Sequence, residues 1–80
     1  MELSRLTVIA KLKLKFGNSF FVKTTEEFDG TENGLWISNE SPLLYDQSMN
    51  YTDERLQSVL DECNWFVDPY DCGTLMLFRK

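Results

Sequence analysis

The stretch TDERLQSVLDEC, residues 52–63, decides the fold together with residues 64–78 that follow it. Its apolar side chains recur at i, i+3, i+4 and i+7, the spacing that places them on one face of an α-helix: Leu56, Val59, Leu60 and Cys63. A helix of about three turns is not stable alone in water. We therefore expect it to bury this face, and a sheet is the expected partner.

The ends of this helix carry capping signals. Thr52 is the expected N-cap, because its hydroxyl can accept a free amide of the first turn. Asp53 and Glu54 follow where the helix dipole favours negative charge. Asn64 can end the helix in a left-handed conformation.

Five segments have the alternation or the β-branched and aromatic composition of strands: Thr7–Phe16, Phe20–Thr25, Leu35–Ile37, Trp65–Asp68 and Thr74–Phe78. A helix over Met1–Leu14 is the alternative for the first segment, but its apolar positions would spread around the cylinder. Turn signals lie between the segments, at Gly17-Asn18, Asp29-Gly30, Asn33-Gly34 and Pro69–Gly73. The segment Asn39–Tyr51 predicts a long loop with room for one helical turn, and such loops are often functional.

These elements predict one α+β domain over residues 1–80. An antiparallel sheet of four to five strands, in the order β-β-β-α-β-β along the chain, would carry one helix packed on one face. The core of an 80-residue chain is small, so a partner or a homodimer could contribute to it. No apolar run approaches the roughly 20 residues of a membrane span, and no signal pattern opens the chain, so we expect a cytoplasmic protein with no membrane partner. There, Cys63 and Cys72 are expected to be reduced thiols.

Charge is divided unevenly along the chain. Residues 1–23 carry five basic side chains against Glu2, whereas residues 24–78 carry twelve carboxylates against Arg55. One interpretation is a solvated surface that keeps a small protein soluble. The other is an acidic face that binds the basic surface of a protein partner, such as a nucleic-acid-binding enzyme. Direct binding of nucleic acid is disfavoured, because phosphates repel the acidic part of the chain.

The residues that catalysis commonly needs are missing. The chain has no His, which removes the commonest general base and metal ligand. Neither cysteine has a neighbour that would lower its pKa, and no glycine-rich phosphate loop occurs. We therefore expect no enzymatic activity and no cofactor.

One segment has the spacing of a calcium-binding EF-hand loop. Asp29, Asn33, Gly34 and Glu40 occupy positions one, five, six and twelve. The flanks do not fit, because a strand is predicted before this segment and Pro42 follows it. A hairpin turn is the alternative, and we expect no metal site.

Aromatic and acidic residues beside turns are the candidate partner-binding residues. Trp65 and Phe66 are adjacent on a predicted strand and point to opposite faces, so one should lie outside the main core. Carboxylates from the turn segment and the helix, with aromatic anchors, would form a protein-recognition surface: Asp29, Glu32, Trp36, Asp61, Glu62 and Tyr70.

The segments Gly34–Ser38 and Asp71–Leu77, together with the size, acidity and lack of His, resemble small acidic accessory proteins of phages and mobile elements. Anti-CRISPR proteins and other inhibitors of host nucleic-acid enzymes belong to this group. The resemblance implies stoichiometric inhibition through a protein–protein surface and transfers no site residue. The alternative is a structural or assembly protein of a phage, or a homo-oligomer without inhibitory role.

Overall fold

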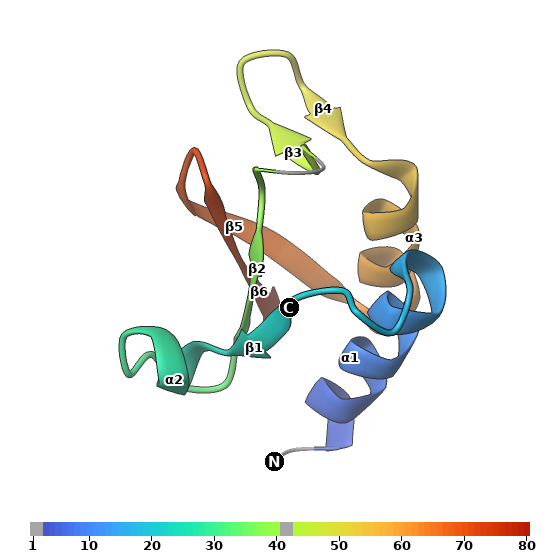
Figure 1. Cartoon of the computed structure of the whole chain (residues 1–80), viewed down its shortest axis with the longest axis vertical. Helices are drawn as coiled ribbons and strands as arrows, with labels where there is room; N and C mark the ends of the chain where they lie inside the picture. The colour runs from blue at the N-terminus through green and yellow to red at the C-terminus, as the bar shows by residue number, and fades with distance from the viewer. Residues whose placement is uncertain (1–2, 41–42) are drawn as a thin grey trace.

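The computed structural model describes residues 3–40 and 43–80, which form a sheet, a small hairpin and three helices. The helices are α1 (Leu3–Phe16), α2 (Thr25–Phe28) and α3 (Glu54–Cys63). The strands are β1 (Val22–Thr24), β2 (Leu35–Ser38), β3 (Tyr45–Asp46), β4 (Tyr51–Thr52), β5 (Trp65–Asp71) and β6 (Thr74–Arg79). Helices α1 and α3 lie side by side behind one face of the sheet, and α2 lies at the other face (Figure 1).

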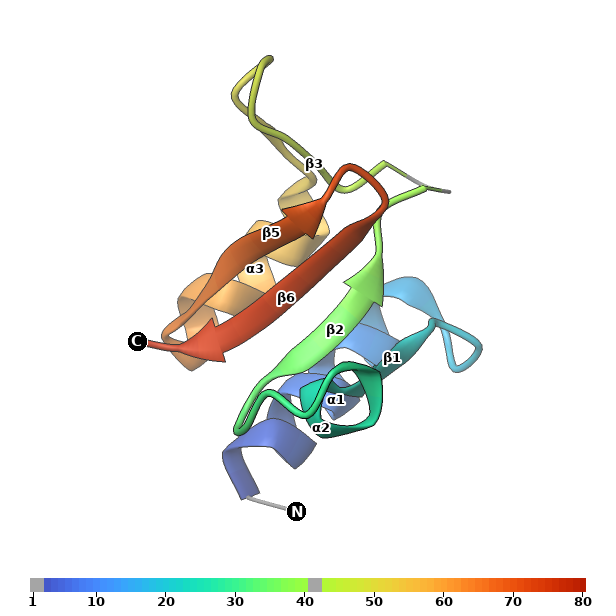
Figure 2. The same ribbon diagram turned by 90° about the vertical axis from the view of Figure 1, so that its left-hand side faces the viewer.

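The sheet has four strands in the order β1-β2-β6-β5, and every neighbouring pair is antiparallel. Strands β3 and β4 pair separately as a two-stranded hairpin. The predicted α+β class and the antiparallel sheet of four to five strands are therefore confirmed. Figure 2 shows the four strands in front of α1 and α3.

Helix α3 forms as its sequence predicts, with one shift at its start. Leu56, Val59 and Leu60 are buried against the sheet. Asn64 ends the helix at φ 60° and ψ 47°, in the left-handed region, as expected. The predicted N-cap at Thr52 is wrong, because Thr52 belongs to β4 and the side chain of Asp53 accepts the Arg55 amide at 2.8 Å. The carboxylate of Asp53 thus acts as the cap.

The predicted strand Thr7–Phe16 is wrong, because α1 covers these residues. Val8 and Leu12 are fully buried and lie one helical turn apart, so both face the sheet. Leu14, which the strand prediction placed with the core residues, is 84% exposed. Helix α1 joins α3 through a Lys11–Glu62 ion pair at 3.0 Å, and the guanidinium of Arg55 lies 4.3 Å above the Phe16 ring. The single predicted helix is thus a pair, and the predicted order β-β-β-α-β-β fails at its first element.

Two other segments differ from their predictions. The predicted strand Phe20–Thr25 is shortened to β1, since Thr25 already starts α2. The predicted loop Asn39–Tyr51 contains the β3–β4 hairpin rather than a helical turn, and its Ser41 and Pro42 lie outside the described residues. Asn39 holds this hairpin: its side chain accepts the amides of Leu44 (2.7 Å) and Tyr45 (2.9 Å).

The core fills the space between the sheet and the helix pair. Its members come from α1, α3, the inward positions of the strands and one residue before β3: Val8, Leu12, Leu35, Ile37, Leu44, Leu56, Val59, Leu60, Trp65, Leu75 and Leu77. Leu35 pairs with Leu77 and Ile37 with Leu75, so these four side chains share the inner face. The residues between them therefore point to the opposite face.

Candidate protein-binding face

The opposite face of the sheet is built mainly from aromatic side chains, together with Met76 and two charged residues, Lys23 and Asp68. Lys23, Trp36, Met76 and Asp68 form one row across all four strands, because each is paired with the next. Phe66 and Phe78 pair in a neighbouring row. We call this surface the aromatic face, and its members are Phe21, Phe28, Trp36, Phe66, Tyr70, Met76 and Phe78.

The rings of the aromatic face contact one another in a chain. The centroid of Trp36 lies 4.8 Å from that of Phe21 and 4.7 Å from that of Phe28. Phe28 in turn meets Tyr70 edge to face at 5.0 Å. Residues far apart in sequence thus form one connected aromatic surface, and such ring pairs stabilise each other beyond simple area burial.

Part of this surface remains open to solvent. Phe21 is 43% exposed, Phe66 41% and Tyr70 54%. Trp36 is half-buried beneath its neighbours, and its indole Nε1 is buried without an acceptor among the described residues. The indole Nε1 of Trp65, on the core side of β5, is likewise buried without an acceptor among the described residues. An unpaired buried donor of this kind is costly to the fold.

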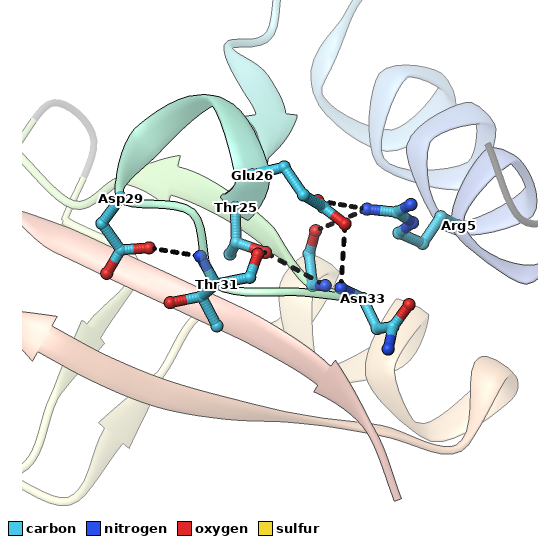
Figure 3. A network of polar contacts seen from close by, with 7 residues as sticks. Arg5, Thr25, Glu26, Asp29, Thr31 and Asn33 are labelled. Atoms are coloured by element: carbon cyan, nitrogen blue, oxygen red, sulfur yellow. Dashed lines mark hydrogen bonds and ion pairs between the residues drawn. The ribbon is translucent and has the colours of Figure 1, made fainter.

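A polar network holds α2 against the sheet and so positions Phe28 (Figure 3). Arg5 of α1 donates to Glu26 at 2.7 Å and to the carbonyl of Gly34 at 3.3 Å. The second oxygen of Glu26 accepts the Asn33 amide at 3.1 Å. Hydrogen bonds from the Asn33 amide, from the backbone amide of Glu26 itself and from the Arg5 guanidinium lower the pKa of Glu26, which therefore stays ionised at neutral pH.

The loop between α2 and β2 is closed by its own side chains. The Thr25 hydroxyl donates to the Thr31 carbonyl at 2.7 Å and accepts the Gly34 amide at 3.1 Å. Asp29 accepts the Thr31 amide at 2.9 Å, and its bonding to Thr31 lowers the pKa of Asp29. Gly34 itself packs so closely that a Cβ there would collide with the ring of Phe78. Only glycine fits where the chain passes the aromatic face.

The structure divides the six sequence-predicted site residues into two groups. Trp36 and Tyr70 lie on the aromatic face, and Asp29 follows Phe28 directly at its edge. Glu32 is exposed in the same α2–β2 loop. The remaining two, Asp61 and Glu62, are exposed on α3, behind the other face of the sheet (Figure 2).

The two helix carboxylates already have partners within the chain. Glu62 pairs with Lys11, which lowers the pKa of Glu62 and raises that of Lys11. Asp61 accepts a hydrogen bond from Gln57 at 2.8 Å. A single interface over the aromatic face would not include them.

Sequence reasoning missed most of the aromatic face. It predicted that Trp65 and Phe66 point to opposite faces, and this is confirmed, since Trp65 is 2% and Phe66 41% exposed. Met76 and Phe78 could not be predicted as outward-facing residues. Strand β6 is apolar on both faces, so its sequence has no alternation that distinguishes the outer side chains from the core side chains. Phe28 gave no signal, because its place depends on the tertiary contacts of α2.

The segment resembling an EF-hand has a different architecture. Residues 35–38 of this segment form β2, in the middle of the sheet, so the helix–loop–helix frame is not present. The carboxylate of Glu40 approaches Gly73 rather than Asp29. Within residues 3–40 and 43–80, no group of three His, Cys, Asp or Glu side chains is arranged to hold a metal ion.

The cysteines are both free thiols. Cys63 is half-buried between the helices, and burial raises its pKa, so the thiolate is disfavoured. Cys72 is exposed in the turn between β5 and β6. The positive charge of Lys11 opposes this rise in the pKa of Cys63, but the effect of burial is larger.

No family model matches this chain, and no curated protein or solved structure is significantly similar to it. Among the described residues, no helix has the length and apolar character needed to cross a membrane.

Proposed function

We propose that this chain is a protein-binding module whose aromatic face binds a basic surface of a protein partner. The observation that carries the proposal is the connected ring system of Phe21, Trp36, Phe28 and Tyr70, whose Phe21 and Tyr70 rings remain exposed. Partly exposed aromatic side chains are enriched at protein interfaces, and buried aromatic anchors carry much of the binding energy.

The charges around this face favour a basic partner. Asp68 lies within its central row and is exposed, and its carboxylate forms no ion pair with a described residue. Glu27 and Asp29 lie on or next to α2, and the only basic residue in the row, Lys23, sits 4.0 Å from Glu27. An acidic rim steers a basic protein surface toward the rings and repels phosphates.

The acidity favours one form of this function, which is stoichiometric inhibition of a nucleic-acid-processing protein. Such a partner presents a basic surface to nucleic acid, and an acidic domain bound there would compete for it. One molecule of the module would block one partner, with no catalysis and no cofactor.

A second candidate, self-assembly, rests on a separate observation. Leu6 and Leu14 are 48% and 84% exposed on α1, and with Ala10 they form an apolar stripe at i, i+4 and i+8. Exposed apolar stripes mark contact surfaces, so an assembly protein or a homo-oligomer would use this side of the molecule. The mass in solution across a dilution series separates a monomeric inhibitor from such an assembly.

The test of the proposed function is site-specific photocrosslinking. A benzophenone amino acid at Tyr70 should capture the partner from extracts of the source cells, whereas the same probe at Gln57, on the outer side of α3, should not. With the captured partner, Trp36→Ala should weaken binding about 30-fold or more through faster dissociation, the effect of losing a central anchor.

The charge reversal Asp68→Lys should instead slow association, and this effect should fade at high salt, since the Debye length is about 8 Å at physiological ionic strength. Asp61→Lys on α3 is the matched control with the same change of charge. Capture at Gln57 but not at Tyr70, or equal effects of the two reversals, would contradict the proposal.

A further inference from the structure

A groove with a volume of about 390 Å³ lies between the β3–β4 hairpin and the turn that joins β5 to β6. Its walls are mainly apolar and include Leu43, Tyr45, Pro69 and Leu75. This volume is near the lower limit of small-molecule pockets. The groove therefore suits a narrow occupant, such as a single long side chain.

Asn39 makes the groove a fixed feature of the fold. Its side-chain amide donates to the carbonyl of Tyr45 at 2.8 Å and to that of Cys72 at 3.3 Å. The backbone amide of Asn39 donates to the carbonyl of Gly73 at 2.9 Å. One buried residue thus ties the hairpin wall to the turn wall, so an occupant need not order the walls on binding.

Two carboxylates line this groove, and each is hydrogen-bonded within its own turn. Oδ1 of Asp46 accepts the amide and the hydroxyl of Ser48, at 3.0 and 2.7 Å. Oδ1 of Asp71 accepts the Gly73 amide at 2.9 Å. In residues 3–40 and 43–80, no basic side chain forms an ion pair with Asp46 or Asp71.

The hydroxyl of Ser48 lowers the pKa of Asp46, which keeps this carboxylate charged at neutral pH. The groove therefore offers apolar walls, an aromatic ring and unpaired negative charge in one place.

We propose that this groove receives the side chain of a lysine or an arginine from the protein partner. The aliphatic stem would pack on Leu43 and Pro69, and the cation would lie by Asp46, Asp71 and the ring of Tyr45. The inference rests on the proposed function, since it places one cation of a basic partner. Tyr70 lies between Pro69 and Asp71, so a protein covering the aromatic face reaches this groove from the same hairpin.

The test uses the whole protein and a defined probe, the peptide acetyl-Gly-Gly-Arg-Gly-Gly-amide. Amide chemical shifts of ¹⁵N-labelled protein should change saturably at residues 43–48 and 70–75. The same peptide with citrulline, which is neutral and nearly the same shape, should bind about threefold or more weakly, as expected for loss of a partly exposed ion pair.

The matched pair of variants then separates the groove from general attraction to an acidic protein. The double change Asp46→Asn and Asp71→Asn keeps an acceptor for each turn hydrogen bond and should weaken arginine-peptide binding about threefold or more. The double change Glu54→Gln and Asp61→Asn removes the same charge from exposed positions of α3 and should leave the affinity unchanged. Leu43→Ser should weaken binding by removing part of the apolar wall.

An absence of saturable shifts, shifts at other residues, equal binding of the citrulline peptide, or equal loss in both double variants would overturn the proposal. Melting curves check that each variant is folded. Photocrosslinking from Tyr70 tests the aromatic face separately, so the groove inference can fail while the proposed function stands.

Discussion

The substitution Asn39→Ala tests how the β3–β4 hairpin is attached to the sheet. Asn39 is only 4% exposed, and its side chain makes four hydrogen bonds. Removing it would leave the buried Leu44 amide without an acceptor. The carbonyls of Tyr45 and Cys72 would lose their donor as well.

The expected loss of unfolding free energy follows from these bonds. Each typical hydrogen bond contributes about 0.5–1.5 kcal/mol net, and a buried group left unpaired costs about 1–3 kcal/mol. The hydrogen bond to the Cys72 carbonyl is long, at 3.3 Å, so its contribution lies at the low end of this energy range. We expect Asn39→Ala to reduce stability by about 3–5 kcal/mol, a large part of the roughly 4–12 kcal/mol typical of a domain this size.

Urea unfolding followed by tryptophan fluorescence measures this loss, and hydrogen exchange at the Leu44 and Tyr45 amides localises it. Asn39→Asp provides a second reading, because a carboxylate keeps the two acceptor bonds but faces two carbonyls. Its deficit relative to the original protein should shrink at acidic pH, where a protonated carboxyl can donate. Gln57→Ala, at an exposed helical site, is the control. A loss below about 1 kcal/mol for Asn39→Ala, with unchanged exchange at both amides, would refute this account.

Three shorter predictions follow from the fold. Leu60 is 2% exposed between α3 and the sheet, so Leu60→Ala should cost about 2–5 kcal/mol in urea unfolding, and a shift of the melting point by only a degree or two would show otherwise. Calorimetric titration of metal-free protein with calcium should give no one-to-one micromolar signal, and one that vanishes in Glu40→Gln would disprove this. The lowered pKa of Glu26 means that its stabilising effect is present above the unfolded glutamate pKa of about 4.3 and is lost as pH falls through the folded value. The acid-unfolding curve of Glu26→Gln should therefore be flatter below about pH 4.3 than that of the original protein, and identical slopes would contradict the network around Arg5.

The sequence was most informative where local signals and tertiary packing agreed. The apolar spacing of α3 and the left-handed Asn64 were both predictable, because one helical face and one residue type carry them. The hairpin of β5 and β6 followed from its strand composition and turn residues. Each of these features depends on contacts between residues close in sequence.

Helix α1 could not be identified from alternation, for a physical reason. Leu12 and Phe16 are spaced by four, which satisfies both a strand face and a helical face. The exposed Leu14 completes the alternating pattern, whereas a helix with a single apolar face would carry a polar residue there. What favours the helix is that its residues are mostly strong helix formers and that Val8 and Leu12 pack on a sheet built from distant segments.

The aromatic face was partly predictable for a related reason. Trp36 and Tyr70 lie beside turn residues, so each could be predicted individually as a candidate binding residue. Their connection depends on Phe28, which the ion pair of Arg5 and Glu26 brings over the sheet from a helix of four residues. A contact between α1 and α2 cannot be predicted from the periodicity of the sequence.

The structure also changes how the acidic charge of this chain should be interpreted. Several of its carboxylates cap helices, close turns or pair with cations of the same chain: Glu26, Asp29, Asp46, Asp53, Glu62 and Asp71. Reversing the charge of any of these would damage local structure, so a weaker complex would not show that the carboxylate touches the partner. Asp68 differs, because it lies in the central row of the aromatic face, is exposed, and its carboxylate caps no helix, closes no turn and pairs with no cation among the described residues. If Asp68→Lys weakens partner binding and leaves the melting point unchanged, the acidic charge contributes to recognition. If Asp68→Lys has no effect on binding, the acidic charge serves solubility and the internal hydrogen bonds and ion pairs described above.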